Sequence, residues 1–356
     1  MDGKTLRLAL AEAYAGSSAA LGARLRPFAS IEDAFAQRER WWPDEPEARR
    51  ERLQSCCAGT AAHPWLAQPA SADWQLIALG DADYPPLLAQ LSDAPGVLFV
   101  RGDPAVLQRP QLAMVGSRGA SAEGRENARL LATALARRGF VITSGLAAGI
   151  DAAAHEGSLG AGQSVAVMGT GPDRIYPARH RQLAEKLLAE GGALVTEFPP
   201  GERAEPFHFP MRNRIISGLS LGVIVVEAAI KSGSLITAKL AMQQGREVFA
   251  LPGSLRNPLS RGCHRLLRDG ANWLEDVDDV LAIFDSMEAL AQAAEHDSLL
   301  QTDAPALLAC FTAGTNSLDQ LQRRSGLLLT ELLQQLTDLE LEGWVEKSSG
   351  GYQRSG

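Results

Sequence analysis

The feature that most constrains the fold is a series of short apolar runs between residues 74 and 285, with helical segments between most of them. The runs are rich in Val, Ile or Phe and are apolar throughout rather than at alternate positions, which indicates strands buried on both faces. Strands that alternate with helices in this way form a doubly wound parallel sheet, so the predicted fold class is α/β. The expected strands are residues 112–116, 140–145, 164–169, 193–198, 222–228 and 247–253.

A chain of 356 residues is longer than a single core usually supports, which predicts more than one domain. Residues 1–70 combine short helical segments with nine acidic and nine basic residues, and they predict a small helical N-terminal domain. The α/β core is expected over residues 74–285. A linker is expected at residues 286–304 and a C-terminal domain at residues 305–356.

The C-terminal domain is predicted to contain three helical segments followed by a hairpin around Gly350 and Gly351, the pattern of a winged helix. Its third helical segment would be the recognition helix, yet this segment contains no Lys or Arg. The segment carries the acidic residues Glu331, Asp338, Glu340 and Glu342. Because contacts to DNA phosphates need cations, a structural or protein-contact role is favoured over duplex binding.

The charge of the chain is unevenly distributed. The formal net charge is −8, and residues 286–356 hold ten acidic and four basic residues. Residues 209–268 instead hold nine Lys or Arg against two Glu, a local charge of +7. Since local potential recruits an anionic ligand, the acidic balance of the whole chain does not exclude nucleic acid.

Four loops that follow expected strands are rich in small and hydroxyl residues: residues 116–121, 144–151, 169–177 and 231–238. In a parallel sheet the loops at the carboxyl ends of the strands share one edge, where ligands bind. Gly permits close backbone approach, and Ser hydroxyls with free helix N-terminal amides bind anions. The sequence therefore predicts a phosphate-lined crevice, with candidate contacts at Ser144, Gly145, Lys231, Ser232, Gly233 and Ser234.

Cationic and aromatic side chains accompany these loops. Arg118 directly follows a strand, where its planar guanidinium can hold a phosphate through two hydrogen bonds. Lys231 precedes a Ser-Gly-Ser helix start. Phe207 and Phe209 offer rings that can stack on a base, although core packing is favoured for at least one of them.

Arg212 and Arg214 flank Asn213 in the stretch FHFPMRNRIISGLS. Two residues apart on a helix, their side chains diverge. One arginine is therefore expected to face the ligand, and the other to serve neighbouring phosphates or acidic side chains. The sequence leaves open which arginine does which.

Signatures of nucleotide-processing enzymes are incomplete. The stretch GTGPDR lacks the third glycine of G-x-G-x-x-G, with Arg174 in its place, and no P-loop pattern occurs. Asp151 and His155 stand four residues apart and are compatible with a general-base pair, but helix-start capping by Asp151 and packing of His155 are favoured. Glu227 ends a buried strand and is either catalytic, a hydrogen-bond acceptor for the crevice loops, or the partner of an arginine. No catalytic residue is predicted.

The cysteines lack the spacing of a zinc site or disulfide framework, and no metal or cofactor is predicted. They are Cys56, Cys57, Cys263 and Cys310. With no 18-residue uncharged apolar run and no export signal, the chain is predicted to be cytoplasmic and not membrane-bound.

Taken in order, the stretches MVGSR, ITSGLAAGIDAAAH, VAVMGTGPDRIYP, FPMRNRIISGLS, VVEAAIKSGSLITAKLAMQQGR and VFALPG resemble the DNA-processing protein A (DprA, or Smf) family. The resemblance covers about residues 80–275. It implies an extended Rossmann-like fold that dimerises, and a single-stranded DNA-binding protein of natural transformation that protects incoming strands and loads the RecA recombinase. The DNA contacts that it implies are Gly116, Ser117, Arg118, Phe209, Arg212, Asn213 and Arg214.

Two positions depart from the family pattern. Leu146 stands where the stretch SGL replaces the commoner SGG, which puts a branched side chain at a place of close backbone approach. Pro206 stands near a position where some members carry a basic residue, which is expected to shift affinity.

Two other functions remain as alternatives. One is a related nucleotide-binding phosphoribohydrolase, which uses a PGGxGTxxE loop; the corresponding neighbourhood here reads KSGSLITAKLA, without the Gly pair or the Glu. The other is a winged-helix regulator with an α/β sensor domain, which the acidic recognition helix opposes.

Overall fold

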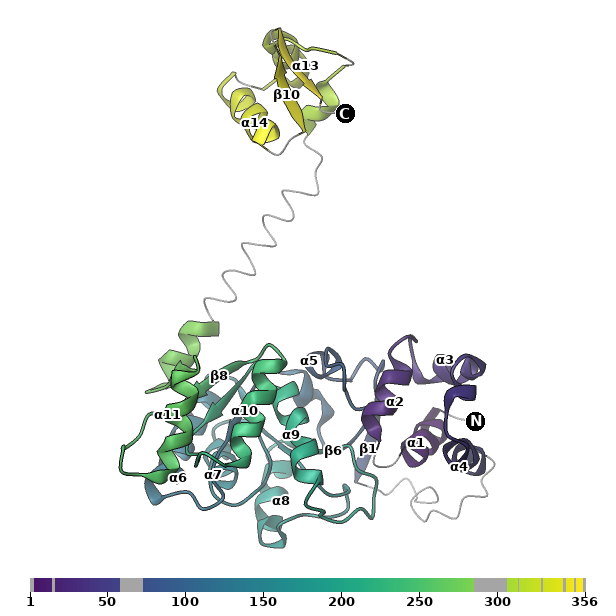
Figure 1. Ribbon diagram of the computed structural model, residues 1–356, viewed down its shortest axis with the longest axis vertical. Helices are drawn as coiled ribbons and strands as arrows, with labels where there is room; N and C mark the ends of the chain where they lie inside the picture. Colours follow the sequence, from purple (N-terminus) through teal and green to yellow (C-terminus); the bar gives the residue numbers. More distant parts are fainter. Residues whose placement is uncertain are drawn as a thin grey trace. The chain divides into compact units, whose positions relative to one another are not determined.

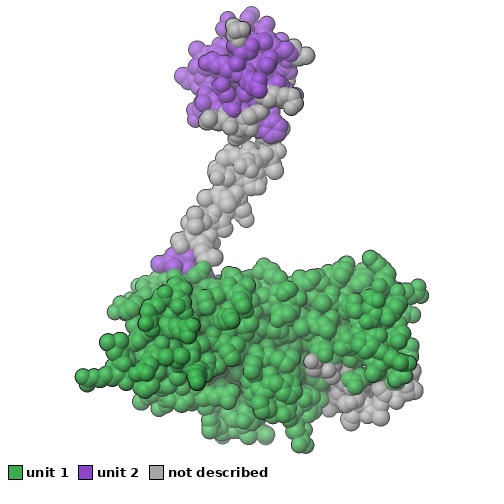
Figure 2. All heavy atoms as spheres, in the orientation of Figure 1, with its two compact units in different colours: residues 1–280 green, residues 281–356 purple. Residues whose placement is uncertain are grey.

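The structure is a computed structural model that describes residues 3–14, 17–57, 73–284, 306–312, 314–327, 329–341, 344–348 and 350–354. The chain divides into two compact units, residues 1–280 and residues 281–356, which are coloured separately in Figure 2. Each unit is described by itself.

Unit 1, shown in Figure 1, is built on a sheet between layers of helices. The sheet has nine strands in the order β1-β2-β6-β5-β4-β3-β7-β8-β9. The seven strands from β6 to β9 in this order are parallel to one another, whereas β2 is antiparallel to both β6 and β1. The strands are β1 (Trp74–Ala78), β2 (Val97–Gly102), β3 (Gln111–Val115), β4 (Val141–Ser144), β5 (Ser164–Val167), β6 (Ala193–Thr196), β7 (Gly222–Val225), β8 (Glu247–Ala250) and β9 (Asn272–Trp273).

The chain changes direction across the sheet at β3. From β3 it moves outward through β4, β5 and β6, then returns to β7 on the other side of β3 and continues to β8 and β9. Strands β3 and β7 pair in parallel, with Leu112 opposite Gly222 and Val115 opposite Val225. The gap beyond their carboxyl ends is a topological switch point, the place where open α/β sheets bind ligands.

Helices cover both faces of the sheet. Val165, Val167 and Val195 share a buried cluster with Ile215 of α9 and Ala238 of α10. The opposite faces of the same two strands carry Ala166 and Leu194, which pack on Ala184 and Leu187 of α8. The helices that connect the strands are α6 (Ala122–Arg137), α7 (Ile150–Ser158), α8 (Arg181–Ala189), α9 (His208–Gly218), α10 (Gly233–Gln243) and α11 (Arg261–Arg268), with the short 3-10 turns η4 (Ala178–His180) and η5 (Pro258–Ser260).

The N-terminal helices pack against the β1–β2 end of the sheet. Leu6, Leu21 and Leu53 belong to the same buried cluster as Ile77 and Phe99. These apolar positions are all nearly inaccessible to solvent, so the helices and the sheet share a continuous core. The elements are α1 (Gly3–Ala13), α2 (Ser18–Leu25), α3 (Ile31–Ala36), η1 (Arg38–Arg40), η2 (Trp42–Asp44) and α4 (Glu47–Cys57), followed within the sheet region by α5 (Pro86–Ala89) and η3 (Pro104–Gln108).

Each of the six expected strands is present and is buried along most or all of its length, which confirms the α/β prediction. The prediction of a wholly parallel sheet was incomplete, because β1 and β2 form an antiparallel end. Between these two strands the chain forms only the four-residue helix α5, which is too short for a crossover connection. They therefore fall outside the strand–helix alternation from which the sheet was predicted.

Unit 2 contains the predicted winged helix. The elements are η6 (Ala306–Cys310), α13 (Leu318–Ser325), α14 (Leu329–Leu341), β10 (Val345–Ser348) and β11 (Gly351–Arg354). Leu321, Leu332, Leu336 and Tyr352 form its buried core with their neighbours. Among the described residues, the first expected helix contains the 3-10 turn η6, while the second begins with a capping box between Ser317 and Gln320.

The predicted linker at residues 286–304 lies outside the described residues, so the domain boundaries around it stay predictions. Within the described ranges, no helix combines the length and apolar character needed to span a bilayer.

Candidate functional site

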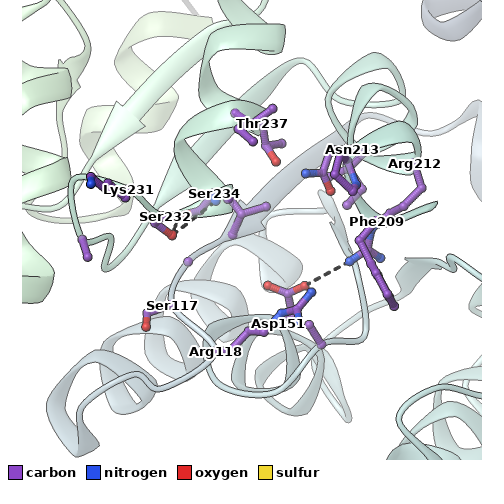
Figure 3. Close-up of a pocket in the computed structure, with 18 of the residues that line it drawn as sticks. Ser117, Arg118, Asp151, Phe209, Arg212, Asn213, Lys231, Ser232, Ser234 and Thr237 are labelled. Carbon is purple, nitrogen blue, oxygen red and sulfur yellow. Dashed lines mark hydrogen bonds and ion pairs between the residues drawn. The ribbon is translucent and has the colours of Figure 1, made fainter. Parts of the chain in front are cut away.

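A cavity of about 700 Å³ opens at the switch point between β3 and β7. It is lined by the loop after β3, the loop after β7 with the start of α10, the start of α7 and the first turns of α9. Figure 3 shows Lys231 and Ser232 on one side of this cavity and Phe209 and Arg212 on the other. We call it the crevice pocket.

The first wall is the segment Gly116, Ser117 and Arg118 that follows β3. The Ser117 amide donates a hydrogen bond to the carbonyl of Glu227 at 2.7 Å, which fixes this loop against the end of β7. A Cβ atom at Gly116 would overlap Ile150 at the start of α7, so only glycine permits this close packing. Arg118 is exposed at the rim and is free to reach an anion.

Glu227 is fully engaged in hydrogen bonds and does not line the pocket. Its carboxylate accepts from the Ser121 amide at 2.8 Å, the Ser121 hydroxyl at 2.7 Å and the Asn257 side chain at 3.1 Å. Ser121 in turn caps the N-terminus of α6. Of the three sequence interpretations, the structure supports the hydrogen-bond acceptor that ties the crevice loops together, since these partners are Ser121 and Asn257 and not an arginine.

The second wall is Lys231 with the first turn of α10. Ser232 is the N-cap residue, and its hydroxyl accepts from the Ser234 amide at 3.3 Å. Gly233 begins the helix and has open space around its Cα. Exposed Lys231 and the positive end of the α10 dipole therefore face the pocket together, an arrangement that favours anions.

Arg212 is buried beneath the pocket, with only 4% of its surface exposed. Its guanidinium donates to the carbonyls of Gly145, at 2.5 Å, and Val167, and lies 3.9 Å from the Asp151 carboxylate. Burial lowers the pKa of Arg212 to about 10, which leaves it protonated at neutral pH. Its Nε atom makes no hydrogen bond to any described residue.

Asp151 holds the loop after β4 in place. Its carboxylate accepts from the amides of Gly145, at 3.1 Å, and Ala147. Burial raises the pKa of Asp151, and the nearby Arg212 charge opposes that shift. His155 hydrogen-bonds Ser164 at 2.7 Å instead of Asp151, so the two residues do not form the general-base pair weighed from the sequence.

Phe209 presents a half-buried ring at the centre of three side chains. The guanidinium carbons of Arg118 and Arg212 lie 5.2 and 5.9 Å from its centroid, within cation–π range. The Tyr176 ring lies 5.6 Å from it at a 45° tilt. Phe207, by contrast, is 60% exposed and does not line the pocket.

Arg214 points away from the pocket into the protein. It forms two hydrogen bonds with Glu197, at 2.6 and 2.8 Å, and a further ion pair with Asp93 at 3.3 Å. Both Arg214 and Glu197 are buried. Arg212 is therefore the arginine on the ligand side. Arg214 instead ties α9 to Glu197, directly after β6, and to Asp93.

Most of the candidate contacts from the sequence come together in the crevice pocket. The lining contains Gly116, Ser117, Arg118, Phe209, Arg212, Asn213, Lys231, Ser232, Gly233 and Ser234. Three candidates do not line it: Arg214, Ser144, whose hydroxyl donates to the Met114 carbonyl, and Gly145. Sequence reasoning missed Tyr176 and Thr237 as lining residues. An aromatic residue at the end of a Gly-rich crevice loop was the available signal for Tyr176.

Leu146, the first departure from the family pattern, adopts a left-handed backbone with φ 58°. Its side chain is fully buried against Met168 and Leu187 and does not line the pocket. The branched side chain therefore does not narrow the crevice. Pro206, the second departure, lies on the pocket lining.

The chain is similar to known proteins over both units. Residues 75–285 match the family described as DNA recombination-mediator protein A, and residues 289–351 match the DprA winged helix domain. Protein Smf of Escherichia coli is 46% identical over 298 residues, which cover 82% of this chain and 79% of that protein. DNA processing protein DprA of Streptococcus pneumoniae is 45% identical over 206 residues, which cover 58% of this chain and 72% of that protein.

Two solved structures share the fold. One is DNA processing protein A from Streptococcus pneumoniae, with a TM-score of 0.65, 35% identity, and coverage of 79% of this chain and 98% of that one. The other is DNA processing protein A from Helicobacter pylori, described for its single-stranded DNA binding mode, with a TM-score of 0.54, 28% identity, and coverage of 60% and 96%. By its sequence and its structure, the chain belongs to the DNA recombination-mediator protein A (DprA/Smf) family.

Proposed function

We propose that the protein binds single-stranded DNA in the crevice pocket and acts as a DNA-processing protein of natural transformation. The observation that carries the proposal is the combination of the half-buried Phe209 ring with the Arg118, Arg212 and Lys231 cations around one cavity. Cations hold phosphates, and an aromatic ring stacks on any base, so this combination binds a strand without reading its sequence.

The depth of the pocket favours a single strand over a duplex. Phe209 sits beside the buried Arg212 rather than on an open surface. A base reaches such a ring only when it is unstacked and turned outward. This costs little in a single strand, whereas turning one base out of a duplex costs about a few kcal/mol.

We assign direct DNA contacts to the ten lining residues named from the sequence. Ser144, Gly145 and Arg214 keep a supporting role, because they do not line the pocket and their polar groups bond within the protein. Asp151 likewise orients Gly145 and Arg212 and is not assigned a catalytic step.

The wider role extends this binding. The family description as a recombination mediator and the relatives named DNA processing proteins support a protein that protects incoming strands and loads the RecA recombinase onto them. A homodimer and a cytoplasmic location belong to the same proposal. An assay of RecA-dependent strand exchange, with and without the protein, tests the loading step; no stimulation contradicts it. Sedimentation equilibrium tests the dimer.

The binding proposal is tested by a salt titration of affinity for single-stranded and duplex oligonucleotides. The variant is Arg118→Ala. The matched control is Arg137→Ala, in the last turn of α6, which ends near the amino ends of the parallel strands and away from the pocket. We expect the protein to bind the single strand more tightly than the duplex. Arg118→Ala should weaken single-strand binding and reduce the slope of log affinity against log salt concentration by about 0.7 for each phosphate contact removed. Equal affinity for duplex, or equal behaviour of the two variants, would contradict the proposal.

The phosphoribohydrolase alternative gains no support from the pocket, since Glu227 is committed to Ser121 and Asn257. Incubation with nucleoside monophosphates tests it directly. Rapid release of free base would show that the protein is an enzyme.

A further inference from the structure

A basic lobe adjoins the crevice pocket and is not part of it. We call residues 254–261 the 254–261 lobe; they run from the loop after β8 through η5 to Arg261, the first residue of α11. Leu255 is 83% exposed, the highest value among the large apolar side chains of the described residues, and Arg256 and Arg261 are exposed as well. None of these residues lines the pocket.

Backbone hydrogen bonds fasten this lobe to a wall of the pocket. The Ala228 amide donates to the Leu259 carbonyl at 2.6 Å, and the Gly262 amide donates to the Ala228 carbonyl at 2.7 Å. The Asn257 side chain donates to Glu227 at 3.1 Å. Because Ala229 and Lys231 line the pocket, the lobe continues the surface on the Lys231 side.

The chemistry of the lobe is that of a single-strand contact. In the described part of the chain, no carboxylate pairs with the guanidinium of Arg256 or Arg261. Ile230, which stands between the pocket-lining residues Ala229 and Lys231 in the sequence, is 52% exposed. Unpaired cations beside exposed apolar side chains match the alternating phosphates and bases of a strand.

Charge also distinguishes the two sides of the pocket. On the side of β5 and β6, residues 168–181 and 197–207 contain four basic and four acidic residues, of which one acid, Glu197, is buried. On the side of β7 and β8, residues 226–232 and 251–261 contain three basic residues and one acid, Glu227, which is buried. With the buried acids left out, basic residues exceed acidic ones by three on the side of β7 and β8 and by one on the side of β5 and β6, so the positive charge is greater on the Lys231 side.

We propose that nucleotides leaving the crevice pocket pass Lys231 and bind the 254–261 lobe, with Arg256 and Arg261 on phosphates and Leu255 against a base. The lobe is thus a second contact site for the same strand. This inference rests on the single-strand binding proposed above.

The test compares fluorescence anisotropy affinities for two poly-thymidine oligonucleotides, one of about 4 and one of about 12 nucleotides, the range covered by known single-strand sites. The variant is Arg256→Ala/Arg261→Ala. The control is Arg265→Ala on the same helix as Arg261, whose guanidinium pairs with Asp269. Thermal melting checks that the variants fold, which is expected because the side chains are exposed.

For the double variant we expect affinity for the longer strand to fall about tenfold. The salt dependence of that affinity should also weaken, with a slope lower by about 1.4, because two phosphate contacts are lost. Affinity for the shorter strand, and both affinities of the control, should stay as in the unmodified protein. Equal losses for both lengths, no loss, or the same loss in the control would overturn the inference. If the unmodified protein binds neither strand, the proposed function is wrong. If the unmodified protein binds both strands and the double variant binds them equally well, only the proposal for the 254–261 lobe is wrong.

Discussion

Arg214 and Glu197 form a buried ion pair with two hydrogen bonds, at 2.6 and 2.8 Å, although they belong to different segments of the chain. Arg212, two residues earlier on α9, makes instead two bonds to backbone carbonyls below the crevice pocket. The same helix thus uses one arginine to hold the fold and the other to face the ligand.

Arg214, which holds the fold, and Arg118, a cation at the rim of the crevice pocket, are therefore expected to differ in what their substitution changes. Arg214→Met leaves Glu197 buried without its partner, so the free energy of unfolding should fall by about 3–5 kcal/mol, while the folded fraction keeps its affinity for single-stranded DNA. Arg118→Met, at the exposed rim, should lose affinity and change stability by less than about 0.5 kcal/mol. Urea denaturation and anisotropy titrations measure both quantities. An Arg214→Met protein of normal stability that no longer binds DNA would reverse the assignment.

A second prediction concerns Gly145. A Cβ atom there would overlap the guanidinium of Arg212, which the Val167 carbonyl and Asp151 already hold. Gly145→Ala should therefore displace Arg212 and weaken DNA binding by about tenfold or more, the value of a lost charged hydrogen bond of roughly 1.5–3 kcal/mol. The control is Gly119→Ala, which meets no atom within 4 Å. Equal affinity of the two variants would show that Arg212 has room to shift.

The sequence predicts the strands of the sheet well because each central strand is buried on both faces and is apolar throughout. It does not indicate β1, β2 or β9. The burial of β1 is uneven and β9 has only two residues, whereas β2 is largely buried but stands outside the strand–helix alternation. The sequence also predicts most of the crevice pocket, since the loops at the carboxyl ends of parallel strands share one edge.

The roles of the two arginines could not be predicted in the same way. Their partners, Glu197 for Arg214 and Gly145 for Arg212, come from segments that only the folded topology brings together. Helical spacing shows that the two side chains diverge, but not which one meets a carboxylate. Tyr176 was missed for a similar reason, because its place beside Phe209 depends on how the loop after β5 packs against α9.

A third prediction follows from the backbone of Leu146. A left-handed φ of 58° costs a non-glycine residue about 1–2 kcal/mol, which Leu146→Gly would relieve. Loss of the fully buried side chain costs more, about 2–5 kcal/mol. The variant should therefore be less stable in urea denaturation, with unchanged DNA affinity in its folded form because Leu146 does not line the pocket. A more stable variant would mean that strain outweighs packing here.

The last prediction concerns pH and His155, which is completely buried between α7 and β5. The Ser164 hydroxyl donates to the Ile142 carbonyl, so the His155 Nδ1–H must donate to Ser164, and the ring is neutral. Burial, together with the Arg212 charge, lowers the pKa of His155 to about 3, against about 6.5 in the unfolded chain. Between these values the unfolded state binds the proton and the folded state does not, so stability is retained above pH 6.5 and is lost as the pH falls toward 3.

The expected size of this effect at pH 4.5 is about 2–3 kcal/mol, from about 1.4 kcal/mol per pH unit below 6.5. Other groups also titrate in this range, so the measurement is a comparison of unfolding free energies from pH 7 to 4.5 in the unmodified protein and in His155→Asn. Asn retains an N–H that can donate to Ser164 and has no titrating ring. Between pH 7 and 4.5, the free energy of unfolding of His155→Asn should therefore fall by about 2–3 kcal/mol less than that of the unmodified protein. Parallel pH profiles for the two proteins would show that His155 does not contribute to acid destabilisation.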